Sequence, residues 1–299
     1  MVRADTLDGG HRRYARALPL ARADIAASAE QLLDAGYGLW LVSHDSVLAQ
    51  LDRSPMGVEV ATLDFLAPHD RPWTIADLMR VYNVLNQTAF GAKGIPLQNW
   101  VMIDLGLLPS AFLLVTLSPQ RAAEAVTDHR VSAAAGARIA SVLPAVLGEA
   151  ERLGYTGPIP VAGYCAARSP IPDGWVGWSL CSAIPGLGTT AKGLALEAYR
   201  ASTLTGVAQF SDPALRVHRK FGRMRLLAAV LELHPVAGTM VYRTEVFVED
   251  EPPPEPTEML GAHDRDAHRD LQNRLDAGAE IDILPPGLVA DRVPILERH

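Results

Sequence analysis

The chain has 299 residues, of which 48% are hydrophobic and 20% charged, a globular composition with enough apolar residues for a sizeable core. Its net charge of −7 is uneven, because the segment from Glu249 onward holds thirteen acidic residues against five arginines and the rest is near neutral. No apolar run reaches the roughly 18 residues of a membrane helix, and the N-terminal residues lack the apolar core of a signal peptide. We therefore expect a cytoplasmic protein with no membrane partner, in which the two cysteines, Cys165 and Cys181, are buried core residues.

The first half of the chain alternates between helical and strand patterns. The predicted elements are a helix over 22–36, a strand over 37–44, a helix over 74–90, strands over 99–108 and 111–118, and a helical region over 118–154. Thr74 and Asp77 have the spacing of a capping box at the start of the second helix. Pro144 is expected to break the alanine-rich helical region.

The second half predicts more strands, and they again alternate with helices. The predicted elements are a strand over 174–184, a helix over 189–202, a strand over 203–210, a short helix over 212–222, strands over 223–234 and 238–248, a helix over 264–278 and an extended apolar segment over 281–296. The proline-rich run at 249–258 marks a boundary, after which we expect an acidic tail. This order favours an α/β fold with helices packed on a sheet that has antiparallel pairs at its ends.

The stretch "SLCSAIPGLGTTAKGLALEAYR", Ser179–Arg200, raises the question of function. An apolar strand ends at a proline, two glycines follow, and a helix begins, so that backbone N–H groups at the helix N-terminus can bind an anion. A phosphate-binding loop of nucleotide triphosphatases is disfavoured, because Ala191 replaces the second glycine and Gly193 the magnesium-binding hydroxyl residue. A dinucleotide fingerprint matches "GLGTTA", but the ribose-binding carboxylate is misplaced, with Asp212 slightly too far along. A plain strand-to-helix turn without a ligand stays an alternative.

A third kind of ligand is indicated by a resemblance. The segment Gly174–Gly222 resembles the core of the GNAT acyltransferase superfamily, through "AIPGLG" at Ala183–Gly188 and "SDPALRVHRKFG" at Ser211–Gly222. Ala214, Val217, Lys220 and Gly222 are in register with the pattern of that family. The departures are Ala183 in place of the usual Gln or Arg, His218 in place of a tyrosine, and a helical stretch that is longer than usual.

The resemblance implies a GNAT-like fold with a mixed, mainly antiparallel sheet and transfer of an acyl group from acyl-CoA, the co-substrate, to a small-molecule amine, with no metal. The residues implied to bind the donor are Leu180, Ser182, Gly186, Leu187, Gly188, Thr189, Thr190, Ala191, Lys192 and Ser211. His218 would protonate the leaving thiolate, since an imidazole exchanges protons near neutrality. Asp104 is the candidate base, with Glu232 as a second strand carboxylate, and an exposed strand face is the simpler interpretation of both.

The basic run Arg216–Arg225 leaves a second partner open. It could contact the phosphates of the donor, the acceptor end of a tRNA in an aminoacyl-tRNA-dependent transferase, or only solvent. A GNAT-like module that binds a partner without catalysis, and a homo-oligomer, are further alternatives. The expected organisation is an N-terminal extension (1–73), a GNAT-like domain (74–248) with a helical insertion at 118–154, and an acidic, proline-rich tail (249–299).

Overall fold

A computed structural model describes residues 20, 22–51, 57–63, 71–91, 108–127, 132–230, 238–249 and 254–298. The chain divides into two units. The described residues of the first unit fall within Ala23–Arg168 and Trp178–Arg200, and those of the second lie mainly within Ser169–Gly177 and Ala201–His299. Strands before residue 74 and after residue 249 are integral parts of the strand order.

The first unit has a sheet in the order β2-β1-β3-β4-β5, of which β5 contributes its second half. Its strands are β1 (Gly38–Ser43), β2 (Glu59–Thr62), β3 (Ser110–Leu117), β4 (Ile159–Arg168) and β5 (Gly174–Ser182). The β1–β2 pair is parallel, whereas β1–β3 and β3–β4 are antiparallel. Every residue of β3 is buried, which makes this strand the centre of the sheet.

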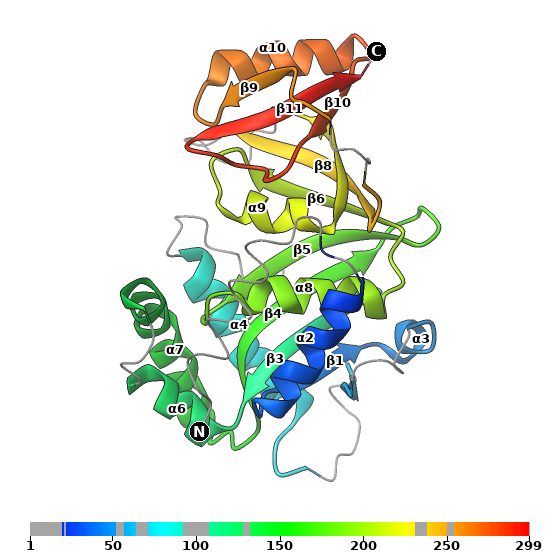
Figure 1. The fold of residues 1–299 in the computed structure, drawn as a ribbon. Helices are drawn as coiled ribbons and strands as arrows, with labels where there is room; N and C mark the ends of the chain where they lie inside the picture. The colour runs from blue at the N-terminus through cyan, green and yellow to red at the C-terminus, as the bar shows by residue number, and fades with distance from the viewer. Residues whose placement is uncertain are drawn as a thin grey trace. The chain divides into compact units, whose positions relative to one another are not determined.

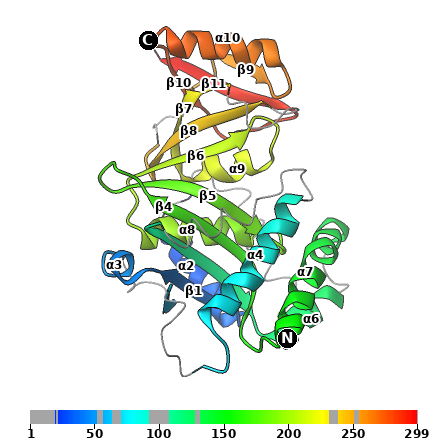
Figure 2. The same ribbon diagram turned by 180° about the vertical axis from the view of Figure 1, so that it is seen from behind.

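Helices cover both faces of this first sheet. They are α2 (Arg22–Asp34), α3 (Asp45–Leu48), α4 (Ile75–Gly91), α6 (Pro119–Thr127), α7 (Ala133–Leu153) and α8 (Leu187–Ala198). Helices α2 and α8 lie over one face, while α4, with α7 packed against it, lies over the other (Figure 1, Figure 2). The sheet is therefore the middle layer of this unit, and α8 is packed directly against its strands β3 and β4.

Two predictions about helix ends and breaks can be compared with helices α4 and α7 of the first unit. The capping box of α4 is confirmed, since the Asp77 N–H donates to Thr74 Oγ1 at 3.0 Å and the Thr74 N–H to Asp77 Oδ2 at 3.2 Å. The expected break at Pro144 is wrong, because α7 continues through this residue to Leu153. Pro144 lies on the exposed side of α7, where water can bond the carbonyl that loses its backbone partner.

By length and composition alone, α7 could also cross a membrane, a test that core helices of soluble proteins pass as well.

The second unit has its own set of strands and its own core. Its described elements are β6 (Thr203–Gln209), α9 (Ala214–His218), the 3₁₀ turn η1 (Arg219–Phe221), β7 (Gly222–Ala228), β8 (Thr239–Val246), β9 (Glu258–Gly261), α10 (Arg265–Asp276), β10 (Glu280–Ile283) and β11 (Arg292–Arg298). The strand order is β6-β8-β7-β10-β11-β9, and all of these neighbours are antiparallel. The expectation of a mixed α/β fold with a mainly antiparallel sheet is confirmed.

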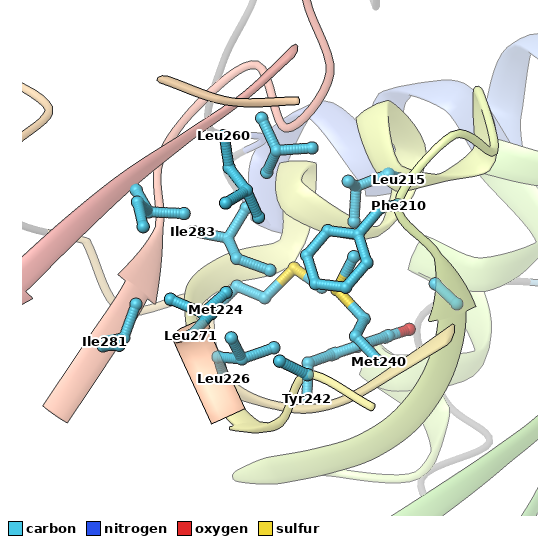
Figure 3. Packing of buried hydrophobic residues seen from close by; sticks show 14 of the residues in the cluster. Phe210, Leu215, Met224, Leu226, Met240, Tyr242, Leu260, Leu271, Ile281 and Ile283 are labelled. Carbon is cyan, nitrogen blue, oxygen red and sulfur yellow. The ribbon is translucent and has the colours of Figure 1, made fainter. Parts of the chain in front are cut away.

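The residues after Glu249 contribute to the core of the second unit. Apolar side chains of β9, α10, β10 and β11 pack with those of β6, β7, β8 and α9 in a single cluster, labelled in Figure 3 by residues such as Met224, Leu226, Leu260, Leu271 and Ile283. Most acidic side chains of the segment lie on its outer surface, whereas Asp282 is buried and pairs with Arg298. The net charge of the segment gives no indication of its apolar side chains, which complete the core of the second unit.

Candidate functional site

The connection between β5 and α8 is a tight turn that contains a left-handed glycine. The Ala183 N–H donates to Val161 O of β4 at 2.8 Å, and the Ser182 hydroxyl donates to Ile184 O. Gly186 then takes φ 90° and ψ −35° and stands as the N-cap of α8, without a side chain to cap it. A residue with a Cβ is strained at this φ, so the turn requires glycine at this position.

The backbone amides at the start of α8 differ in how they are bonded. The Leu187 N–H donates to Ile184 O at 3.3 Å, and the N–H groups of Thr189 and Thr190 donate to Gly186 O at 3.1 and 3.4 Å. Within the described part of the chain, no acceptor is found for the Gly188 N–H. The first turn of α8 therefore offers the helix dipole and one amide without a partner in these ranges to an anion.

A positive side chain from a distant segment is bonded to this turn. Arg138 of α7 donates from Nε and Nη2 to Ser182 O, at 3.1 and 3.0 Å. The guanidinium is half-buried, and burial lowers its pKa below the usual value. Among the described residues no carboxylate forms an ion pair with it. Its positive charge thus stands beside the turn whose own sequence carries Ala183 in place of the Gln or Arg of the family pattern.

Lys192, predicted to bind the donor, lies one turn into α8 and is fully buried. Its ammonium lies 5.8 Å from the centroid of the Tyr164 ring of β4. Burial lowers the pKa of Lys192 to about 7, because the charged form loses its hydration. The side chain faces the sheet, and its assignment to the donor stays a prediction.

The remaining residues predicted on this turn lie close together. Leu180 and Ser182 of β5 face α8, since a Cβ at Gly188 would lie 3.5 Å from a side-chain carbon of each. Thr189, Thr190 and Ala191 are buried along α8. The structure therefore brings the predicted residues of β5 and α8 into one layer of the first unit.

On the opposite face of β5 lies a buried polar cluster. The Ser179 hydroxyl donates to Asn86 Oδ1 of α4 at 2.5 Å, and both residues are buried. The two cysteines are free and buried as expected, and burial raises the pKa of Cys181 to about 12 and that of Cys165 well above its usual value. Thiols held protonated in this way are poor nucleophiles, which favours a packing role.

In the second unit, His218 is the last residue of α9 and is half-buried. Its ring packs on that of Tyr242 of β8, with centroids 5.5 Å apart and planes at 36°. Ser211 lies two residues after the end of β6. Asp104 and Glu232 lie outside the described residues, so no carboxylate base can be placed.

The basic run of the second unit is largely bonded to its own unit. Arg219 is 3% exposed and forms a bidentate pair with Glu249, and it donates to the carbonyls of Gly222 and Ile283. The other ion pairs or hydrogen bonds are Arg216 to Leu288 O at 2.8 Å, Arg223 to Glu245 at 3.5 Å, and Arg225 to Glu280 at 3.0 Å and Asp282 at 3.6 Å. These arginines stabilise the second unit through its carboxylates and carbonyls.

Two residues near the predicted positions were not identified in the sequence, Arg138 and Tyr242. Arg138 lies 44 positions before the residue that it bonds, and nothing in its local pattern marks that contact. The sequence places Tyr242 in a predicted strand and gives it no further role. In the described ranges, no group of three His, Cys, Asp or Glu side chains is arranged to hold a metal ion.

Comparisons with known proteins find distant structural likeness. No protein-family model and no curated protein matches the sequence. A solved structure from Desulfovibrio desulfuricans, described as a candidate acetyltransferase of the GNAT family, is similar to this chain with a TM-score of 0.32 and 12% identity. The likeness covers 57% of this chain and 90% of that one. At that level it carries no argument about activity.

Proposed function

We propose that the protein transfers an acyl group from an acyl-CoA thioester to the amine of a small molecule. The observation that carries this proposal is the turn between β5 and α8, with its left-handed Gly186, the Gly188 amide and the guanidinium of Arg138 on Ser182 O. A helix N-terminus with a nearby positive side chain favours a doubly charged pyrophosphate over a neutral ligand. The family resemblance supplies the identity of that ligand as coenzyme A.

In this reaction the amine attacks the thioester carbonyl and the thiolate leaves. The predicted backbone donors to the oxyanion are the N–H groups of Leu180 to Ser182 on β5. His218 stays the predicted proton donor by resemblance. The contacts of Arg216, Arg219, Arg223 and Arg225 within their own unit give no specific support to the tRNA alternative. The oligomeric state and cytoplasmic location stay predictions.

Binding and catalysis test the proposal separately. Isothermal titration with CoA should give saturable binding that weakens with salt, because phosphate contacts are screened. Gly188→Ala is the test variant, because an added Cβ leaves less space for a phosphate to approach the backbone N–H of residue 188. Gly148→Ala is the matched control, because Gly148 lies in α7 and nothing lies within 4 Å of an added Cβ there. We expect weaker CoA binding for Gly188→Ala alone.

Acyl transfer is then measured with acetyl-CoA and a panel of amines, by the release of free thiol and by mass spectrometry of the product. CoA binding without transfer to any amine would favour a non-catalytic binding module. No binding of CoA at millimolar concentration would contradict the proposal and leave the plain strand-to-helix turn as the interpretation of the β5–α8 connection.

A further inference from the structure

The strands of the second unit have a second face, opposite the apolar cluster. Burial alternates along β7 and β8, so that Met224 and Tyr242 lie in the cluster, where Figure 3 labels them, while the next residue along each strand points the other way and is half-buried. Both described helices of this unit, α9 and α10, also contribute side chains to the cluster and therefore pack on its side of the strands. We call the opposite face the arginine face; it carries Arg223, Arg225, Val241, Arg243 and Glu245.

The register of the strands places two guanidinium groups opposite each other on the arginine face. Arg243 of β8 is the antiparallel partner of Arg225 of β7. Residues directly opposite in such a pair lie on the same face, with Cβ atoms about 4.5–5.5 Å apart, and like charges in this arrangement are destabilising. Two arginines are therefore a stable choice here only where negative charge is supplied to both of them.

Carboxylates supply negative charge to the other arginines of this face but not to Arg243. Its side chain has no hydrogen bond or ion pair with any residue that the structure describes. In the described part of the chain, four arginines thus share three carboxylates, which leaves one positive charge in excess. The ion pairs are Arg223 with Glu245 at 3.5 Å, Arg225 with Glu280 at 3.0 Å and with Asp282 at 3.6 Å, and Arg298 with Asp282 at 2.5 Å.

The position of the Arg243 guanidinium makes its lack of an acceptor costly. Its Nε is buried and has no hydrogen-bond partner in the described ranges, and a buried donor without an acceptor destabilises the folded state. The Nε–H and Nη–H groups of an arginine form a planar fork that matches two oxygens of a carboxylate or a phosphate. Thr205 of β6, the register partner of Arg243 on its other side, adds a hydroxyl beside the guanidinium. An oxyanion from outside the chain would satisfy these donors.

Apolar side chains lie next to the arginine pair. Val207 of β6 and Val241 of β8 are register partners, two residues along their strands from Thr205 and Arg243 and on the same face. Val207 is 46% exposed, which is unusual for a valine within a strand. A ligand with its oxyanion on Arg243 can therefore lay a short apolar group over these valines.

We propose that Arg243 and Arg225 form a binding site for a small molecule that carries a carboxylate or a phosphate next to a short apolar chain. The oxyanion accepts hydrogen bonds from Nε and Nη of Arg243, and its negative charge lowers the repulsion between the two guanidiniums. All residues of this site belong to the second unit, so the inference is independent of the proposed acyl transfer and of the β5–α8 turn.

The first test uses inorganic phosphate, butyrate and butyl phosphate, each titrated at constant ionic strength into the full chain labelled with ¹⁵N. The Arg243 Nε–H resonance, assigned by its absence from the Arg243→Gln spectrum, should shift saturably. Butyl phosphate should bind more tightly than phosphate, because its chain covers Val207 and Val241. Comparison of butyl phosphate with butyrate then decides between the two kinds of oxyanion. No shift with any of the three probes at millimolar concentration overturns the proposal.

Variants separate the site from general charge attraction. Arg243→Gln should weaken binding of the preferred probe about tenfold or more, the loss expected for hydrogen bonds to a charged group, and should raise Tm in anion-free buffer because the repulsion is gone. Arg243→Lys keeps the charge without the fork and should recover part of the affinity.

The matched control is Arg292→Gln, which removes an exposed positive charge from β11 of the same unit and should leave the affinity unchanged. Equal losses in Arg243→Gln and Arg292→Gln would overturn the proposal, because net charge would then account for the binding. A second comparison uses Arg138→Gln, whose guanidinium lies beside the β5–α8 turn. Binding that is lost in Arg138→Gln and kept in Arg243→Gln would place the anion at that turn and overturn the assignment to the arginine face.

Discussion

Lys192 carries a charge that the folded protein disfavours. Burial lowers its pKa to about 7, whereas the unfolded chain holds it near 10.5, so the unfolded state binds the extra proton between these values. Stability should therefore rise with pH from about 7 to about 10.5, by about 1.4 kcal/mol per pH unit. Lys192→Met should raise Tm at pH 7 and flatten this dependence in thermal melts. Lys192→Arg, which stays charged, should lower Tm. If Lys192→Met were less stable than the wild type at pH 7, the folded state would favour the charged ammonium, against this prediction.

His268 should make the second unit sensitive to acid. Its ring stacks on Phe210 at 4.1 Å, Nε2 bonds Gly261 O at 3.0 Å, and Nδ1 is buried with no hydrogen-bond partner in the described ranges. Burial lowers the pKa of His268, while the nearby Asp264 raises it and His263 and Arg265 lower it. Because the folded pKa lies below that of the unfolded chain, stability is present above about pH 6.5 and is lost as the pH falls.

The measurement is urea unfolding between pH 7 and 5. His268→Phe should remove part of the loss of stability on acidification. His263→Asn is the comparison variant: because His263 is exposed and only adds to the effect of burial on the pKa of His268, it should change the profile much less than His268→Phe. Equal profiles for the wild type and His268→Phe would assign the acid sensitivity to other groups.

Some residue-level features could be predicted from the sequence and others could not. Gly186 was selected for its place in a strand-to-helix turn, and its φ of 90° gives the physical reason for glycine there. Gly222 has φ 134°, and an added Cβ would lie 1.9 Å from Glu245 O. Gly188 differs, because its helical position would accept a Cβ at ordinary contact distances. Arg138 contacts a residue 44 positions away, which a local pattern does not encode.

At the scale of elements, the start of α8 gives a matched pair of variants. Gly186→Ala should cost about 1 kcal/mol of unfolding free energy, because alanine is strained at positive φ. Gly188→Ala should be neutral or more stable by up to about 1 kcal/mol, since alanine favours the helix and its Cβ meets Leu180 and Ser182 at 3.5 Å. Urea denaturation of both proteins measures the difference. Equal destabilisation would mean that the turn differs from the one described.

Most described helices and strands follow from periodicity and caps, and the missed strands have two different causes. Strand β4, buried except for its last residue, contains Pro160, Gly163 and several alanines in place of a run of β-branched residues. Its glycine is there because a Cβ would lie 2.4 Å from the Tyr82 ring. Strands β2 and β9 have four residues each, too few for a pattern of alternation. The strand predicted over 99–108 lies almost entirely outside the described residues.

At the scale of the molecule, the residues after Glu249 should be essential for the second unit. A chain that ends at Glu249 keeps the ion pair of Arg219 but loses the apolar partners of Met224 and Leu226 from α10 and β10. We expect it to lose cooperative unfolding and to be cleaved rapidly by protease between residues 201 and 249. Leu271→Ala in the full chain should cost about 3 kcal/mol, as a graded control. A truncated protein with an unchanged Tm would refute this.

The bond from Arg138 to Ser182 O places a constraint on the long helical insertion. An inserted helix of this kind is a natural choice for deletion when a shorter version of a domain is designed. Here, deleting α7 would release the carbonyl that precedes the glycine turn and remove the positive charge beside it. Helix α7 thus contributes to the structure of the turn through Arg138. A chain without α7 would need another positive side chain bonded to Ser182 O.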